Sequence, residues 1–237
     1  MVPKQGSSMP SAKAEDYLKA IYQLREGEEP VATSTVAEAL DVTAPTVTAT
    51  MKRLEGHGLV EREEYKGVRL TEEGELVALE TIRHHRLLEL FLAEHLNYDW
   101  AEVHDEADRL EHHISERLET ELAATLGDPS ADPHGAPIPN EKLEPTEADD
   151  EPLTEYEEGE TLVVTQVADS DPDVLSYLAD AGIRPGTRLT IREIAPFGML
   201  TVAPEEHDET VSLPAEIAAE VRVQAGERPE DEPATAD

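Results

Sequence analysis

Histidines and acidic residues alternate in one short part of the chain. Six of the nine histidines lie between Thr81 and Ile114, with Asp and Glu residues among them. Four side chains at i, i+4, i+7 and i+8 are expected on one stripe of a helix: His104, Asp108, Glu111 and His112. Upstream, His85 and Glu89 form a second i, i+4 pair. Imidazole nitrogens and carboxylate oxygens that converge in this way can hold a divalent transition metal.

A structural reading competes with this one, because a lone histidine is usually a packing residue and an acidic chain places carboxylates near everything. A catalytic metal site has no support. The helical zinc-hydrolase motif His-Glu-x-x-His and the di-iron motif Glu-x-x-His are both missing from the sequence. A serine nucleophile elbow and a phosphate-binding glycine loop are also missing. The chain is therefore expected to bind metal without being an enzyme.

Composition narrows the class of protein further. The chain has no cysteine, which excludes disulfides, thiolate zinc sites and cysteine catalysis. No stretch approaches the roughly 20 apolar residues that a membrane span needs, and the polar start Met1 to Pro10 does not resemble a signal peptide. We expect a cytoplasmic protein with no membrane partner.

The net charge of −35 is extreme. Such acidity can indicate disorder, but the apolar periodicity is strong, so adaptation to molar salt in a halophile is favoured. Residues 1–75 carry 9 Lys and Arg against 14 Asp and Glu, so most of the excess acid lies further along. The excess of Lys and Arg that is typical of a nucleic-acid-binding surface is therefore missing. At about 1 M salt, however, the Debye length falls to about 3 Å, and distant acids hardly repel DNA.

Residues 11–71 are predicted to form three helices followed by a hairpin. The first helix runs from Ser11 to Arg25, and a capping box at Thr35 opens a short second helix that ends near Leu40. The third helix starts at Pro45, buries Val47, Met51 and Leu54, and ends at Gly56 and Gly58. A hairpin over 59–70 turns near Lys66-Gly67. This order of elements is that of a winged helix-turn-helix domain.

The third helix is the candidate DNA-reading element. Its small hydroxyl side chains suit contacts with phosphates and thymine methyl groups in the major groove of double-stranded DNA. The residues expected to point outward, toward DNA, are Thr43, Pro45, Thr46, Thr48, Ala49, Thr50 and Lys52. A polar face exposed only to solvent is the alternative.

Residues 72–127 are predicted to be a helical metal-binding and dimerisation domain. Thr71 caps a helix that runs to about Leu96 and is apolar almost all round, which indicates burial on more than one side and hence a homodimer. A second helix, from about Trp100 to Leu126, is expected to carry the histidine stripe.

The remaining chain divides into three segments. Residues 128–158 are rich in Pro, Asp and Glu and are expected to be a mobile linker. Residues 159–225 alternate like short strands, with one helix from Pro172 to Ala181, and predict a small β-barrel. Residues 226–237 are expected to be a disordered acidic tail. The predicted fold class is α+β.

These segments together resemble the iron- or manganese-dependent repressors of the diphtheria toxin repressor type, in their long form with a C-terminal SH3-like domain. The resemblance covers Ala14 to about Val223. It rests on five motifs: Glu15-Asp16-Tyr17-Leu18-Lys19-Ala20-Ile21-Tyr22, Ala44-Pro45-Thr46-Val47-Thr48, Gly58-Leu59-Val60, His85-Arg86-Leu87-Leu88-Glu89, and Val103-His104-Asp105-Glu106-Ala107 with Glu111-His112. The turn at 182–186 is similar to one in the SH3-like module, which also occurs in ferrous-iron transport accessory proteins.

The resemblance implies two metal sites. One would use Asp16, Asp108, Glu111 and His112, and the other His85, Glu89 and His104. In some members the SH3-like domain helps the second site, and Asp171 is the candidate for that role, although Val174 beside it cannot bind a metal.

Two departures from the family pattern bear on the metal. Iron-type members have Met and Cys where this chain has Asp16 and Asp108, and the oxygen donors shift the preference toward Mn(II), with Fe(II) still acceptable. Manganese-type members also use a Glu where this chain has Lys19, which puts a two-manganese centre in question.

The function implied by the resemblance is metal-gated repression of metal-uptake genes by a dimer on a palindromic operator. The alternatives are a winged-helix regulator without metal input and a metal-transport accessory or storage protein.

Overall fold

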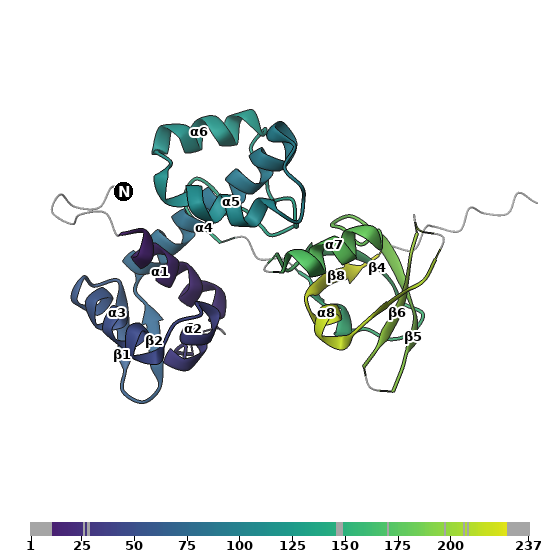
Figure 1. Ribbon diagram of the computed structural model, residues 1–237, viewed down its shortest axis with the longest axis horizontal. Helices are drawn as coiled ribbons and strands as arrows, with labels where there is room; N and C mark the ends of the chain where they lie inside the picture. Colours follow the sequence, from purple (N-terminus) through teal and green to yellow (C-terminus); the bar gives the residue numbers. More distant parts are fainter. Residues whose placement is uncertain are drawn as a thin grey trace, which may run out of the picture. The chain divides into compact units, whose positions relative to one another are not determined.

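The structure, a computed structural model, describes residues 11–226 except positions 26, 28, 146–148, 170, 197, 206 and 208. The chain forms two compact units (Figure 1). The first unit comprises Met1–Leu88, Asp108–Asp128 and Ile138–Thr146, and the second comprises Glu89–Ala107, Pro129–Pro137 and Glu147–Asp237. Residues 1–10, which were not expected to form a signal peptide, lie outside the described residues, as does the expected tail over 226–237 apart from Gly226.

The first unit begins with three helices and a two-stranded hairpin, in the order that the sequence predicts. Their bounds are α1 Ala12–Leu24, α2 Thr33–Ala39, α3 Ala44–Gly56, β1 Val60–Glu63 and β2 Gly67–Leu70. The buried faces of α1 and α3 share one core, to which α1 contributes Leu18 and Ile21 and α3 contributes Val47, Met51 and Leu54. This common core couples the position of α3 to that of α1.

The hairpin is tied to the segment before α2. Val31 and Val68 exchange two backbone hydrogen bonds of 2.9 Å each. Gly67 has a φ of 143°, and a Cβ at this position would lie 2.1 Å from the carbonyl oxygen of Val31. Only glycine permits this close approach. The hairpin is therefore held in a fixed position next to the segment that leads into α2.

The predicted capping box at Thr35 is wrong. Helix α2 begins two residues earlier, at Thr33, and Ala32 occupies the N-cap position with no side-chain hydrogen bond. Thr35 therefore lies inside the first turn of α2, where its side chain does not cap the helix. By contrast, the predicted cap at Thr71 is confirmed, since its Oγ1 accepts a 3.1 Å hydrogen bond from the amide of Gly74.

Helix α4 (Glu72–Leu96) is long and unbroken, but the single helix predicted after it is not. That segment forms α5 (Val103–Leu110), a 3₁₀ turn η1 (Glu111–His113) and α6 (Glu116–Thr125). Ile114 is extended, and the Ser115 hydroxyl accepts from the amide of Leu118, which starts a new helix. The predicted stripe is therefore cut after Leu110, and Glu111 and His112 lie on a tighter turn.

The second unit contains a six-stranded antiparallel sheet with strand order β3-β8-β4-β5-β6-β7 (Figure 1). The strands are β3 Glu151–Pro152, β4 Thr161–Val167, β5 Arg188–Ile194, β6 Leu200–Pro204, β7 Val211–Leu213 and β8 Val221–Ala225. The 3₁₀ turn η2 (Leu153–Glu155) and helices α7 (Pro172–Asp180) and α8 (Ala215–Ala219) complete it. Alternate residues such as Leu189 and Ile191 are buried in one apolar core, as period-2 patterning requires.

The expectation of a mobile linker is wrong for the buried part of 128–158. In the second unit, Asp132 Oδ1 accepts hydrogen bonds from the amides of His134 and Ala136, at 2.8 and 3.0 Å. In the first unit, Ile138 packs against Leu87 and Ala123. The segment contains few apolar residues, but those residues are buried, and the Asp132 carboxylate accepts hydrogen bonds from two backbone amides. Composition alone therefore wrongly predicted that the segment is mobile.

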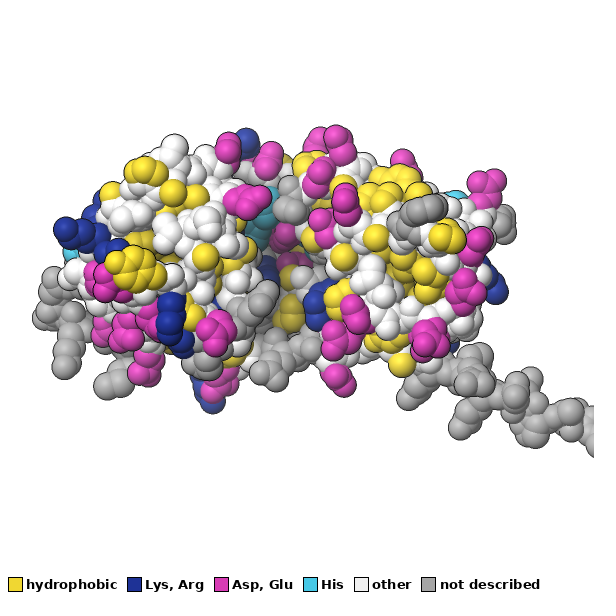
Figure 2. Space-filling model, turned by 90° about the horizontal axis from the view of Figure 1, so that it is seen from below, with side chains coloured by type: hydrophobic (Ala, Val, Ile, Leu, Met, Phe, Trp, Pro, Cys, Tyr) yellow, Lys and Arg dark blue, Asp and Glu magenta, His cyan; other side chains and the backbone are white. Residues whose placement is uncertain are grey.

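Acidic side chains are spread widely. Figure 2 shows Asp and Glu scattered over the visible surface of both units rather than gathered in one patch. Among the residues that the structure describes, no helix is long and apolar enough to span a membrane.

Candidate metal centre and DNA-binding helix

The first candidate metal group lies in the first unit and joins α1 to η1. Its members Asp16, Glu111 and His112 each place one ligand atom within 4.8 Å of the others. His112 Nε2 lies 2.8 Å from Asp16 Oδ1 and 3.5 Å from Glu111 Oε1, and its Nδ1 lies 2.6 Å from Glu15 Oε2. The turn that follows the broken helix thus carries a histidine that reaches the start of α1.

A second set of donors adjoins the first and shares Glu111. His85 Nδ1 lies 2.6 Å from Glu111 Oε2 and 3.2 Å from Asp108 Oδ1. Lys19 lies among the three, with Nζ 2.7 Å from Glu111 Oε2, 2.9 Å from Asp108 Oδ1 and 3.1 Å from His85 Nδ1. His85, which the family resemblance assigned to the other site, therefore also contacts Asp108 and Glu111.

Burial and charge shift three groups of this cluster. Burial raises the pKa of Asp16, helped by the nearby charge of Glu111 and opposed by His112. Burial favours the neutral form of Lys19, but Glu111 and Asp108 outweigh it and hold the pKa of Lys19 above its usual value. Burial likewise opposes ionisation of Asp108, yet the hydrogen bond with His85 and the Lys19 charge lower its pKa. Lys19 is thus a firmly charged ammonium.

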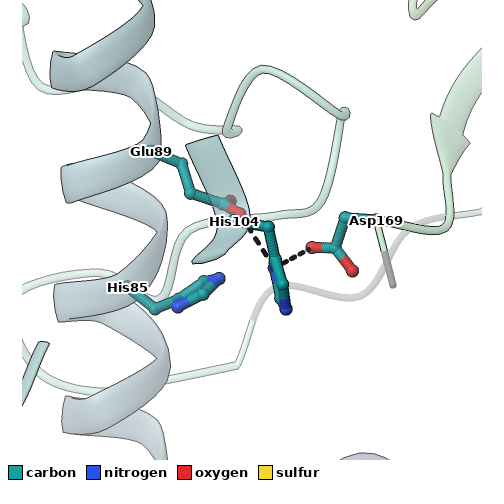
Figure 3. A group of neighbouring side chains, drawn as sticks. All are labelled: His85, Glu89, His104 and Asp169. Atoms are coloured by element: carbon teal, nitrogen blue, oxygen red, sulfur yellow. Dashed lines mark hydrogen bonds and ion pairs between the residues drawn. The ribbon is translucent and has the colours of Figure 1, made fainter. Parts of the chain in front are cut away.

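The second candidate metal group lies in the second unit. Glu89 is fully buried, and its Oε1 lies 3.2 Å from His104 Nδ1, which lies 3.6 Å from Asp169 Oδ2 (Figure 3). Burial opposes the charge on Asp169, but the hydrogen bond with His104 lowers its pKa. His85 is drawn with them and lies one turn before Glu89 on α4. The predicted pairing of Glu89 with His104 is therefore present.

Two residues of the segment once expected to be a linker adjoin this group. Asp132 and His134 offer ligand atoms within 4.8 Å of those of Glu89 and Asp169. His134 is fully buried, with Nδ1 3.8 Å from Glu89 Oε2 and Nε2 2.8 Å from the carbonyl oxygen of Trp100. Burial would lower the pKa of His134, but Glu89 outweighs it and raises the pKa. No periodic pattern in the sequence marks these two residues as candidate ligands.

The residue of the SH3-like domain beside the candidate group is Asp169, and the expectation of Asp171 is wrong. Asp171 Oδ1 accepts hydrogen bonds from the amides of Asp173 and Val174, at 2.9 and 3.3 Å. It therefore caps α7, which a carboxylate stabilises. The two aspartates are two positions apart, so sequence alone could not choose between them.

Three of the six histidines between Thr81 and Ile114 were left out of the predicted sites, and they have other surroundings. His84 lies against Glu119 and the carbonyl oxygen of Glu111, at 3.3 and 3.2 Å. His95 and His113 are exposed.

Both groups have the donor chemistry of a Mn(II) or Fe(II) site. Their oxygens and nitrogens come from carboxylates and imidazoles, the ligand types that these ions accept. Glu89 and Glu111 are 0% and 2% exposed, and carboxylates so deeply buried need a compensating cation or strong hydrogen bonds. The residues present therefore fit a divalent ion.

Helix α3 offers a polar face, with one correction. Thr43, Pro45, Thr48, Ala49 and Lys52 are exposed, as predicted, and Thr46 is half-buried. Thr50 is only 7% exposed and packs inward, so the prediction that it points outward is wrong. Its place one turn before the buried Leu54 explains this, because positions i and i+4 share a face. The Thr48 hydroxyl donates to the carbonyl oxygen of Ala44 at 3.0 Å.

The sequence matches three family models in succession. Residues 9–68 match the iron dependent repressor N-terminal DNA binding domain, residues 71–140 match the iron dependent repressor metal binding and dimerisation domain, and residues 151–225 match the FeoA domain. Among curated proteins, the chain is 36% identical over 224 residues to the iron-dependent repressor IdeR of Mycobacterium tuberculosis strain H37Rv, covering 89% of this chain and 96% of that protein. It is 35% identical over 187 residues to the diphtheria toxin repressor of Corynebacterium efficiens, covering 75% and 81%.

Solved structures agree with these matches. A manganese-dependent transcriptional repressor in complex with manganese superposes with a TM-score of 0.84 at 39% identity, covering 90% of this chain and 99% of that one. The structure of the manganese regulator SloR superposes with a TM-score of 0.75 at 31% identity, covering 90% and 98%. The predicted α+β fold with its helix-turn-helix, dimerisation and SH3-like parts is thereby confirmed. The chain belongs to the iron-dependent repressor family.

Proposed function

We propose that this protein is a metal-dependent DNA-binding transcriptional repressor in which Mn(II) or Fe(II) acts as corepressor. The observation that carries the proposal is the contact between His112 and the first helix of the DNA-binding domain, with Nε2 2.8 Å from Asp16 Oδ1. The relatives bear names or titles of iron- and manganese-dependent repressors. The carboxylate oxygens of Asp16 and Asp108 favour Mn(II) as the corepressor.

The route from the candidate ligands to DNA runs through α1. Asp16 on α1 and His112 on η1 would hold the ion, which would supply positive charge between carboxylates that otherwise repel one another. Leu18 and Ile21 on the opposite face of α1 share a core with Val47 of α3. A fixed α1 therefore fixes α3 for DNA binding, so a ligand that favours this arrangement raises DNA affinity.

The proposed DNA partner is a palindromic operator upstream of metal-uptake genes, bound by a homodimer. Two copies of α3 in a symmetric dimer would enter successive major grooves. Thr43, Pro45, Thr46, Thr48, Ala49 and Lys52 are the proposed contacts. The match to a dimerisation domain over 71–140 supports the dimer.

The test is DNA binding by fluorescence anisotropy, with DNA from the chain's own promoter region at constant high salt. We expect Mn(II), relative to chelator, to raise the affinity of the unaltered protein on the order of 10-fold. His112→Ala should lose this increase, because it removes the link to α1. His113→Ala, the exposed neighbour, should keep it.

Each outcome that contradicts the proposal points to a different function. Equal binding of DNA with metal and with chelator would indicate a regulator without metal input. Metal binding without any DNA binding would indicate an accessory or storage protein. Replacing Mn(II) by Fe(II) under anaerobic conditions ranks the two candidate ions.

A further inference from the structure

The ammonium group of Lys19 lies among side chains that could otherwise bind a metal ion. Its Nζ lies within 3.1 Å of Glu111 Oε2, Asp108 Oδ1 and His85 Nδ1, and its side chain is only 11% exposed. These three residues are by themselves a group with ligand atoms within 4.8 Å of one another. The ammonium is therefore centred on a set of donors that could otherwise surround a metal ion.

The two oxygens of Glu111 divide the cluster. Oε2 lies 2.7 Å from Lys19 Nζ, whereas Oε1 faces His112 Nε2 at 3.5 Å. One carboxylate therefore serves two neighbouring cation positions. The position facing His112 and Asp16 is the one that a divalent ion can take, while the other already holds a positive charge.

We propose that the Lys19 ammonium is a built-in cation that replaces a second metal ion, so that this centre takes a single divalent ion at Asp16, Glu111 and His112. The inference rests on the proposed function. Its chemical basis is that an ammonium carries one fixed charge and three hydrogen-bond donors, which match two carboxylates. A second divalent ion would have to enter beside that charge, and like charges repel.

The test counts Mn(II) ions in the full chain, in a Glu89→Gln background, which removes the charge of a carboxylate that belongs to both sets of donors around the second candidate group. Equilibrium dialysis against Mn(II) chloride with elemental analysis should give about one ion per chain. The electron paramagnetic resonance spectrum should be that of isolated Mn(II).

Replacing the ammonium by a carboxylate should open the second position. In the same background, Lys19→Glu should bind about two ions per chain, with a spectrum showing magnetic coupling between neighbouring ions. Lys13→Glu, the same charge change at an exposed position of α1, should still bind about one.

Two results would overturn the inference. One is a coupled pair of ions in the protein that retains Lys19, which would mean that metal displaces the ammonium. This measurement decides the matter even if Lys19→Glu does not fold. The other is a folded Lys19→Glu variant that still binds a single ion. A chain that binds no Mn(II) at all refutes the proposed function itself, and this inference with it.

Discussion

Glu89 is a fully buried acid whose two oxygens face different histidines. Oε1 lies 3.2 Å from His104 Nδ1 and Oε2 lies 3.8 Å from His134 Nδ1. Asp169 approaches the same His104 from the SH3-like domain. Residues that hydrogen-bond to a metal ligand fix its orientation. The side chains around Glu89 should therefore govern how tightly this group holds an ion.

Asp169 provides the test at the residue scale. Asp169→Asn keeps the shape but removes the charge, and we expect Mn(II) affinity at this group to fall by about 10-fold or more. The measurement is calorimetric titration in a His112→Ala background, which disables the first group. Asp171→Asn is the control, since asparagine caps a helix as well as aspartate does. An equal loss in both variants would contradict a specific role for Asp169.

The individual ligands were predictable only in part. Helical spacing paired His85 with Glu89 and drew attention to His104, Glu111 and His112. It could not reveal that Lys19 meets Asp108 and Glu111, because they are 89 and 92 positions away and meet only after folding. Asp169 and His134 were missed for the same reason.

At the scale of elements, the contact of α4 with α6 depends on a small network of charges. Arg83 on α4 is 6% exposed and donates to Glu119 on α6 at 2.5 Å and to the carbonyl oxygen of Pro139 at 2.7 Å. His84 lies 3.3 Å from the other Glu119 oxygen. The hydrogen bond with His84, followed by that with Arg83, lowers the pKa of Glu119 despite partial burial.

Glu119→Gln should therefore destabilise the protein by about 1–3 kcal/mol at neutral pH, because it leaves Arg83 less well compensated. A carboxyl with a lowered pKa stabilises the fold above its unfolded pKa, and this contribution is lost as pH falls through the lowered value. Urea unfolding at constant salt, with chelator, should show a gap between the two proteins at pH 7 that closes under acid conditions. A gap that stays constant with pH would contradict this account.

Helix ends were less predictable than helix faces. The buried faces of α1 and α3 follow the 3.6-residue period, and Thr71 caps α4 as its position predicts. The break after Leu110 has no glycine or proline to announce it, and Ser115 as the cap of α6 competes with the continuous helical pattern. The local preference of Thr35 for a cap yielded to the helix start at Thr33.

At the scale of the whole molecule, the net charge of −35 leaves far more acidic groups than Lys and Arg side chains can pair with. Acids spread over the surface repel one another, and salt screens that repulsion by shortening the Debye length from about 10 Å at 0.1 M to about 3 Å at 1 M.

Raising KCl over this range should therefore increase the free energy of unfolding by at least about 1 kcal/mol, which corresponds to about 2–4 °C in Tm. Thermal unfolding by circular dichroism measures this. Sucrose at matched water activity serves as the control, because it does not screen charge. A Tm that is unchanged or lower in KCl would contradict the expected dependence on salt.

Folded segments were predictable where the apolar pattern is regular, and they were missed where apolar residues are sparse. The SH3-like strands alternate clearly, whereas the segment around Asp132 and Ile138 buries a few residues within an acidic, proline-rich stretch. Composition averages over such a stretch, while folding depends on the particular positions that are buried.

The all-carboxylate and imidazole make-up of the candidate centres has a consequence for oxidative damage. Thiolates and thioethers are the ligands that peroxide converts to sulfenic acid or sulfoxide, which abolishes metal binding. Asp16 and Asp108 offer oxygen atoms in place of sulfur, and the sequence contains no cysteine. None of the candidate ligands in the described residues is therefore a thiolate or thioether, so direct oxidation of ligand sulfur by peroxide cannot remove the donors of these two groups.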